Sequence, residues 1–177
     1  MDRIFAQLDH DEDLMRMALA YVLTMRGVPQ IYYGTEILMT NGDDTSHGTI
    51  RSDFPGGWEG DEKNAFTGEG LSAQEKDIQA FVRTLLNWRK DQPVIHSGKT
   101  MQFSPEDATY VFFRYTEDDA VMVAINKNSE AVNLELDRFE ERLTGYRAGV
   151  DVTSGANLPL GETLQLPARS VLVLDLE

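Results

Sequence analysis

The 177-residue sequence lacks cysteine and has few basic residues. Without cysteine there can be no disulfide framework, thiolate nucleophile or thiolate metal site. Sixteen Lys and Arg against thirty Asp and Glu give a formal net charge of -14, which argues against binding nucleic acid through phosphate neutralisation. No apolar run approaches the roughly 20 residues of a membrane span. We therefore expect neither nucleic acid nor a membrane as a partner, and the composition indicates no particular compartment.

The first third of the chain has the pattern of a buried helix followed by a short strand. Asp11 or Asp13 can cap a helix whose wide apolar stripe runs from Leu14 to Met25, and Gly27 suits its C-terminal end. Residues 30–33 are mostly apolar and do not alternate with polar residues. This pattern predicts a strand that is buried on both faces.

A long loop and a second helix follow. Residues 34–70 are rich in glycine and show no clear periodicity, and a loop of this length in a compact protein is usually functional. Ser72 and Glu75 form a capping box for a helix that ends before Pro93. One doubly buried strand between two helices cannot make a sheet alone, so this half is predicted to be a slice of a repeating βα architecture.

After Pro93 the pattern changes to short strands separated by turn residues, which is typical of an antiparallel sandwich or barrel. Strands are expected at residues 110–115, 120–125, 131–136, 163–166 and 170–176. We predict a domain boundary between residues 1–95 and 96–177.

Two stretches resemble a known family. GVPQIYYGTE at residues 27–36 resembles the last barrel strand of the α-amylase family of glycoside hydrolases, and RSDFPGGW at residues 51–58 is similar to a loop of its neopullulanase and cyclomaltodextrinase branch. The resemblance implies an α+β fragment. Residues 1–95 would be the end of a TIM (β/α)8 barrel, and residues 96–177 the antiparallel Greek-key sandwich called domain C.

The resemblance also implies where the catalytic groups lie. The family uses an Asp nucleophile, a Glu acid/base and a further Asp, and their positions are expected before residue 1. Asp9-His10-Asp11 resembles the Asn-His-Asp motif of the family, but Arg3-Ile4-Phe5 fits the pair that follows the true motif. We interpret residues 9–11 as a polar lead-in and helix cap, and we expect no catalytic residue in this chain and no activity from it alone.

Five residues are candidates for substrate binding. The resemblance implies that Asp43, Asp44 and Arg51 hydrogen-bond glucose hydroxyls, and the alternative is an exposed salt bridge within the loop. Glu36 directly follows the predicted strand, where barrel enzymes carry functional side chains, although it can equally cap the next loop. Trp58, in a Gly-Gly loop, is a candidate platform for a sugar ring.

No metal or cofactor is expected. Asn41, Asp43 and Asp44 supply oxygen ligands but lack the spacing of a calcium loop and its distal bidentate Glu. The three histidines are too scattered for a metal site.

The sequence thus predicts the C-terminal portion of a retaining hydrolase that cleaves α-1,4-glucosidic bonds in starch-like oligosaccharides or cyclodextrins, with an α-glucan oligosaccharide as partner of the complete enzyme. The alternative is a stand-alone carbohydrate-binding or structural accessory domain. The apolar face between Leu14 and Tyr33 predicts either self-association or contact with a barrel portion supplied in trans.

Overall fold

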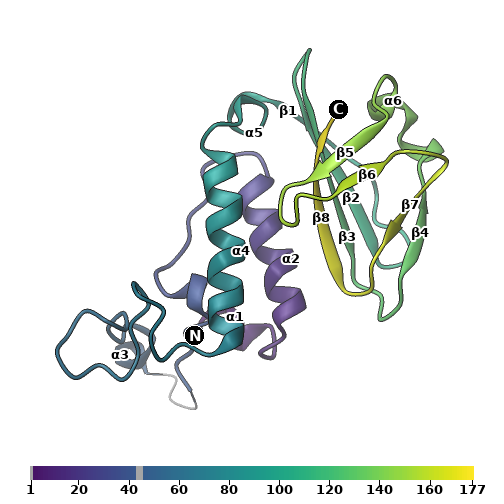
Figure 1. The fold of residues 1–177 in the computed structure, drawn as a ribbon. Coiled ribbons are helices and arrows are strands. Elements are labelled where there is room, and N and C mark those ends of the chain that lie inside the picture. The colour runs from purple at the N-terminus through teal and green to yellow at the C-terminus, as the bar shows by residue number, and fades with distance from the viewer. Residues whose placement is uncertain (1, 43–45) are drawn as a thin grey trace. The chain divides into compact units, whose positions relative to one another are not determined.

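The computed structural model describes residues 2–42 and 46–177 (Figure 1). Its helices are α1 (Ile4–Gln7), α2 (Glu12–Thr24), η1 (Thr35–Ile37), α3 (His47–Ile50), α4 (Ala73–Arg89), α5 (Pro93–Ser97), η2 (Asp137–Phe139) and α6 (Glu140–Leu143). Its strands are β1 (Lys99–Gln102), β2 (Thr109–Tyr115), β3 (Ala120–Asn126), β4 (Val132–Glu135), β5 (Ala148–Asp151), β6 (Asn157–Pro159), β7 (Thr163–Leu166) and β8 (Ser170–Leu176). Among the described residues, no helix has both the length and the hydrophobicity needed to cross a membrane.

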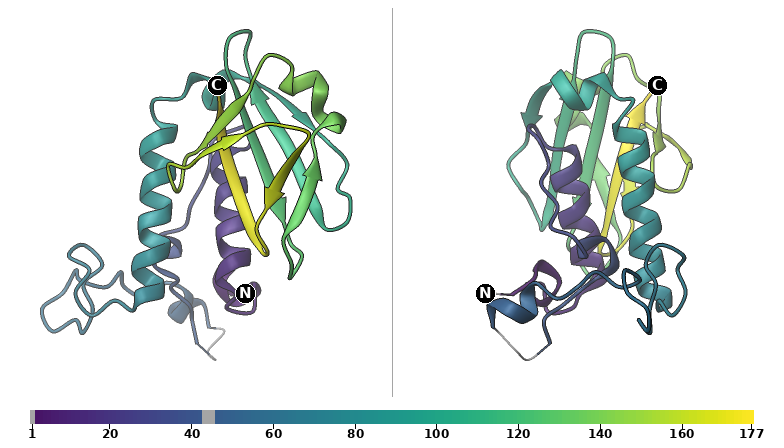
Figure 2. Two further views of the ribbon diagram at one scale, coloured as in Figure 1. Left: turned by 45° about the vertical axis from the view of Figure 1, so that its right-hand side comes forward. Right: turned by 90° about the vertical axis from the view of Figure 1, so that its left-hand side faces the viewer.

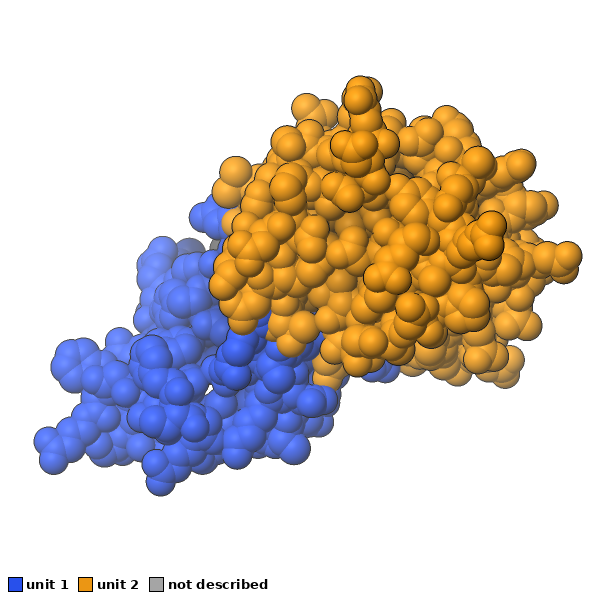
Figure 3. Space-filling view, turned by 45° about the horizontal axis from the view of Figure 1, so that its top comes forward, with its two compact units in different colours: residues 1–15, 30–83 blue, residues 16–29, 84–177 orange. Residues whose placement is uncertain are grey.

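The chain forms two compact units, which Figure 3 colours separately. Unit 1 comprises Met1–Met15 and Gln30–Arg83, and unit 2 comprises Arg16–Pro29 and Thr84–Glu177. The division falls inside α2 and inside α4, so the first part of each helix belongs to unit 1 and the last part to unit 2.

Both predicted helix caps are confirmed. The carboxylate of Asp11 accepts a hydrogen bond from the backbone N–H of Leu14 at 3.0 Å, which places Asp11 as the cap of α2. In α4, the N–H of Ser72 donates to Glu75 Oε2 at 2.6 Å and the N–H of Glu75 donates to Ser72 Oγ at 3.1 Å. This reciprocal pair is the expected capping box.

The strand predicted at residues 30–33 is wrong. These residues have no regular structure, and Tyr32 and Tyr33 are 47% and 36% exposed. A strand needs a neighbour to pair with its backbone groups, and the described part of unit 1 offers only an isolated bridge between Asn64 and Glu69. The apolar composition was therefore not sufficient to form a strand in this unit.

Arg3 holds this segment in place instead. Its Nη1 donates to the carbonyl of Tyr33 at 2.6 Å, and its guanidinium lies 5.0 Å from the ring centre of Tyr32 and 4.8 Å from that of Tyr33. The backbone N–H of Arg3 also contacts Asn41 Oδ1 at 3.4 Å. The buried residue Arg3 thus joins the start of the chain to residues 32–41: its guanidinium contacts a carbonyl and two aromatic faces, and its backbone N–H donates to the Asn41 side chain.

Unit 2 contains an antiparallel β-sandwich. Its large sheet has the strand order β1-β2-β3-β8-β5-β6, and its small sheet pairs β4 with β7. Between them lies an apolar core that includes Phe113, Met122, Leu166 and Leu174, with Phe139 of η2 at its edge. The sandwich part of the predicted fold is confirmed.

The second face of the large sheet is also covered within unit 2. The ring of Tyr21, on α2, lies edge-on to Phe112 with ring centres 5.8 Å apart. Trp88, on α4, donates from Nε1 to Asp175 Oδ2 of β8 at 3.2 Å. The last turns of α2 and α4 therefore lie beside this face (Figure 2), and every residue of β3 is buried.

All five predicted strands are present, and three further strands were missed. The missed strands β1, β5 and β6 are four, four and three residues long. Their sequences, KTMQ, AGVD and NLP, contain polar residues, glycine or proline and so carry little strand signal. They form because neighbouring strands offer backbone groups to pair with: β1 pairs with β2, β5 with β8, and β6 with β5.

Arg114 is the largest fully buried side chain of unit 2. Its Nη2 donates to the carbonyl of Gly98 at 2.7 Å, its Nε to Lys99 at 3.3 Å and its Nη1 to Thr24 at 3.4 Å. Burial lowers the pKa of Arg114 from its ordinary value, and the nearby charges of Arg89 and Arg26 lower it further. The cation is held by backbone carbonyls from the end of α2 and from the α5–β1 connection.

Arg114→Met should destabilise unit 2 by about 3 kcal/mol, because three carbonyls lose their donor and each costs about 1 kcal/mol. Urea unfolding followed by circular dichroism measures the change.

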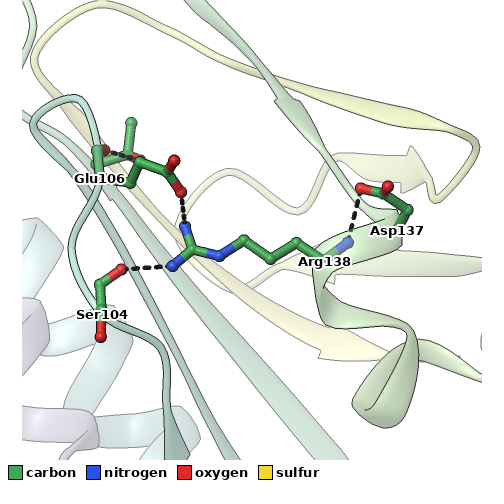
Figure 4. Close-up of polar contacts among 5 residues, drawn as sticks. Ser104, Glu106, Asp137 and Arg138 are labelled. Atoms are coloured by element: carbon green, nitrogen blue, oxygen red, sulfur yellow. Dashed lines mark hydrogen bonds and ion pairs between the residues drawn. The ribbon is translucent and has the colours of Figure 1, made fainter.

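Arg138→Met is the matched control (Figure 4). Arg138 Nη1 pairs with Glu106 Oε2 at 2.5 Å and Nη2 donates to the carbonyl of Ser104 at 2.8 Å, but the side chains of Arg138 and Glu106 are 35% and 61% exposed. Exposed pairs contribute about 1 kcal/mol or less. Equal losses in the two variants would contradict the assigned role of Arg114.

Glu75 makes the start of α4 sensitive to pH. Partial burial alone would raise the pKa of Glu75, but hydrogen bonds from Lys63 and Ser72 hold that pKa below its usual value. Because the pKa is lower in the folded state, the stabilisation is present above the unfolded pKa and is lost as pH falls through the folded value. The first amides of α4 should therefore lose protection from hydrogen exchange as the pH falls, and Glu75→Gln should remove this pH dependence. Hydrogen exchange measured from pH 6 down to pH 3 tests this, and an unchanged pH profile would count against it.

Candidate functional site

Glu36 lies in unit 1 on η1, directly after the segment held by Arg3. Gly34 precedes η1 in a left-handed conformation with φ of 81°, and Leu38 ends it with φ of 59°. The N–H of Met39 donates to the carbonyl of Gly34 at 2.9 Å, which closes a tight turn around Glu36. Among the described residues, Oε2 of Glu36 is buried and has no hydrogen-bond partner. This oxygen therefore has unused capacity to accept a hydrogen bond.

The tight turn requires glycine at position 34. A Cβ built there would lie 2.2 Å from Met39 Sδ, and the positive φ disfavours any other residue. This glycine is the second one of the GVPQIYYGTE motif, so the motif fixes the backbone path that presents Glu36.

Arg51 follows α3 as its C-terminal cap and is exposed. The structure shows no ion pair for its guanidinium among the described residues. The hydroxyl of Tyr33 donates to the carbonyl of Ser52 at 2.9 Å, so the segment that carries Arg51 lies beside the segment that leads to Glu36. The predicted partners Asp43 and Asp44 lie outside the described residues.

Trp58 is 68% exposed, and its backbone is fixed by Asp61. Oδ2 of Asp61 accepts from the N–H of Gly56 at 2.7 Å and from the N–H of Trp58 at 3.1 Å. The indole is therefore displayed to solvent from a turn with a defined backbone.

Three further residues of this loop were not singled out from the sequence. Asp61 and Asn64 organise the loop by accepting backbone N–H bonds, and Phe66 is 74% exposed. The signal was present, because Asp and Asn often accept bonds from N–H groups close by in sequence and so fix turns. In the described residues, no group of three or more side chains that could hold a metal ion was found.

The sequence of this chain is similar to those of known enzymes that act on α-glucans or carry the name α-amylase. Residues 100–175 match the model of the cyclo-malto-dextrinase C-terminal domain. Over 80% of its length the chain is 29% identical to a cyclomaltodextrin glucanotransferase of Geobacillus stearothermophilus, and over 98% it is 25% identical to a maltogenic α-amylase of Bacillus acidopullulyticus. The expected resemblance to α-amylase-family enzymes is confirmed.

The fold of the chain is also similar to part of a solved α-amylase structure. The α-amylase from H. orenii superposes on 99% of the chain with a TM-score of 0.72 and 25% sequence identity. The chain covers 38% of that structure, and 18% and 27% of the two curated relatives. It thus corresponds to a minor part of each of these three proteins.

Gly34→Ala should loosen the turn around Glu36, because the added methyl group meets Met39 Sδ and alanine disfavours positive φ. We expect a loss of at least about 1 kcal/mol of local protection at the amide of Met39. Hydrogen exchange of the intact chain measures it.

Gly27→Ala is the control for Gly34→Ala. Gly27 also has a positive φ, 118°, but an added Cβ would meet nothing within 4 Å. If Gly27→Ala loosened the amide of Met39 as much as Gly34→Ala does, contact with Met39 would not be the cause.

Proposed function

We propose that this chain is the C-terminal portion of a retaining α-glucan hydrolase that cleaves α-1,4-glucosidic bonds in starch-like oligosaccharides or cyclodextrins. The observation that carries the proposal is the match of nearly the whole chain to a maltogenic α-amylase and of most of it to a cyclomaltodextrin glucanotransferase. Both names denote enzymes that act on α-glucans. The sandwich supports the barrel, and the long loop supplies substrate contacts.

Three side chains in unit 1 suit such contacts. Among the described residues, Glu36 Oε2 has no hydrogen-bond partner and the exposed Arg51 has no ion pair, and Trp58 is an exposed ring. Vicinal sugar hydroxyls both donate and accept, and pyranose rings have an apolar face for an aromatic side chain. Asp43 and Asp44 complete the proposed set.

The reacting carboxylates are not proposed among these residues. Retaining hydrolysis needs two carboxyl groups about 5 Å apart that flank one glycosidic bond. Asp9 and Asp11 do not suit this role, because the carboxylate of Asp11 caps α2 and Asp9 lies in the turn before it with φ of 54°. The reacting groups would come from a barrel portion that unit 1 contacts, and self-association through residues 14–33 is the competing proposal.

A stand-alone sugar-binding sandwich is the alternative. Phe112, Phe113 and Phe139 of the sandwich are fully buried. An open cavity of about 580 Å³ beside η2 and α6 is bordered mainly by carboxylates and leucines, with Tyr146 as its aromatic residue. These features favour a supporting role for the sandwich.

The 177-residue chain should bind maltoheptaose weakly and release no reducing sugar from starch, pullulan or cyclodextrin. Calorimetry and a reducing-sugar assay measure the two properties. Arg51→Ala should weaken binding about fivefold by removing a hydrogen-bond donor, whereas Arg147→Ala, a change in the sandwich, should leave binding unchanged.

Two results would refute the proposal. One is turnover that disappears when Asp9 or Asp11 is replaced, because this would place the reacting carboxylates here. The other is binding of maltoheptaose that is lost on changing the sandwich but not on changing Arg51, because this would favour the alternative.

A further inference from the structure

The loop between α3 and α4, whose backbone path is visible in Figure 1, carries two exposed large aromatic side chains. Trp58 is 68% exposed and Phe66 is 74% exposed. The same loop packs Leu71 and Ala65 against Ile37, with Phe54 and Met39 beside them. It thus has a small apolar core of its own and still leaves its two largest remaining rings in water.

The loop is built from specific hydrogen bonds although it contains no helix or strand. The N–H of Ala65 donates to the carbonyl of Pro55 at 3.1 Å, so the two arms of the loop lie side by side. Asn64 Oδ1 accepts from the N–H of Phe66 at 3.0 Å and of Thr67 at 3.1 Å. The side chain of Gln79, on α4, donates to the carbonyl of Ala65 at 2.8 Å. The backbone at Phe66 is therefore anchored on both sides.

The Phe66 ring is also oriented. It packs against Phe54 in an edge-to-face arrangement, with ring centres 5.3 Å apart and an interplanar angle of 63°. The Phe66 ring is thereby in contact with one neighbouring ring, and most of the residue stays accessible. A ring that is held before binding loses less conformational freedom when a ligand arrives.

The charges of the loop restrict the ligand. Glu59, Asp61, Glu62 and Glu69 are exposed carboxylates, and the single lysine of the loop, Lys63, is paired with Glu75 at 2.7 Å. An anionic ligand would be repelled by these groups. A neutral ligand with apolar faces and hydroxyl groups fits, since aromatic rings contact its faces and carboxylates accept its hydroxyl hydrogens.

We propose that Trp58 and Phe66 form a two-ring platform that binds an α-1,4-glucan chain, each ring contacting a different glucose unit. The two rings project from arms that are joined at Pro55 and Ala65, where Gly56 packs against Asn64. The inference rests on the proposed function and adds to it a second contact, Phe66, and a preference for longer oligosaccharides.

Calorimetry of the intact chain with maltoheptaose, maltose and cellohexaose tests the platform. Phe66→Ser should weaken maltoheptaose binding about fivefold, the range of one aromatic contact, and should change maltose binding by less than about twofold. Phe66→Tyr keeps the ring and should bind like the parent chain. Cellohexaose, whose linkages are β-1,4, should bind more weakly than maltoheptaose.

Val28→Ser is the matched control, because Val28 is 95% exposed and lies outside the loop. Equal weakening by Val28→Ser, or by Phe66→Tyr, would overturn the platform. So would light scattering that shows dimers of the parent chain and monomers of Phe66→Ser, because the rings would then form an interface between copies. If Phe66→Ser leaves maltoheptaose binding unchanged but Arg51→Ala weakens it, the platform is refuted and the proposed function is not. If the parent chain does not bind maltoheptaose at all, both proposals are refuted.

Discussion

The guanidinium of Arg114 is the interaction on which unit 2 depends most. It occupies a fully buried position in β2 and is held by carbonyl groups from the end of α2 and from the connection between α5 and β1. Removing an arginine from water is costly, so the surrounding backbone must converge on it from several directions. Arg89 acts in the same region, where its Nη2 contacts the carbonyl of Gly27 at 3.3 Å. Helix ends and sheet are thereby positioned by one network.

Because of this network, unit 2 contains the ends of two helices in addition to the two sheets of the sandwich. The small sheet covers one face of the large sheet, and the last turns of α2 and α4 contact the other face through Tyr21 at β2 and Trp88 at β8. A boundary between residues 95 and 96 stays a prediction. Each compact unit includes part of both long helices, so the helices cannot be assigned to a single unit.

Much of the secondary structure followed from local rules. The cap at Asp11 and the box at Ser72 and Glu75 were predictable because each depends on residues within one turn of a helix. The alternating strands were predictable for a similar reason. Prediction failed where strand pairing decides the outcome. Residues 30–33 have no pairing strand in the described part of unit 1, whereas the weakly patterned β5 gained one in β8.

The candidate site was predictable to a smaller extent. The motif pointed to Glu36, Arg51 and Trp58, but the geometry around them depends on contacts between distant residues. Tyr33 reaches Ser52 across 19 positions, and Phe66 gains its orientation from Phe54. Such contacts depend on how the loop closes, which neither periodicity nor residue spacing specifies.

The burial of β3 has a further consequence. Its sequence, AVMVAIN, is uncharged, apolar and free of proline and glycine, which is the composition of segments that stack into amyloid-like fibrils. In the folded chain both of its edges are paired, with β2 on one side and β8 on the other. The outer strands of the sheet are the short β1 and β6, and they carry Lys99 and Pro159. A charge and a proline at the edges hinder pairing with strands of other molecules. The fold therefore places its aggregation-prone segment, β3, at the centre of the sheet.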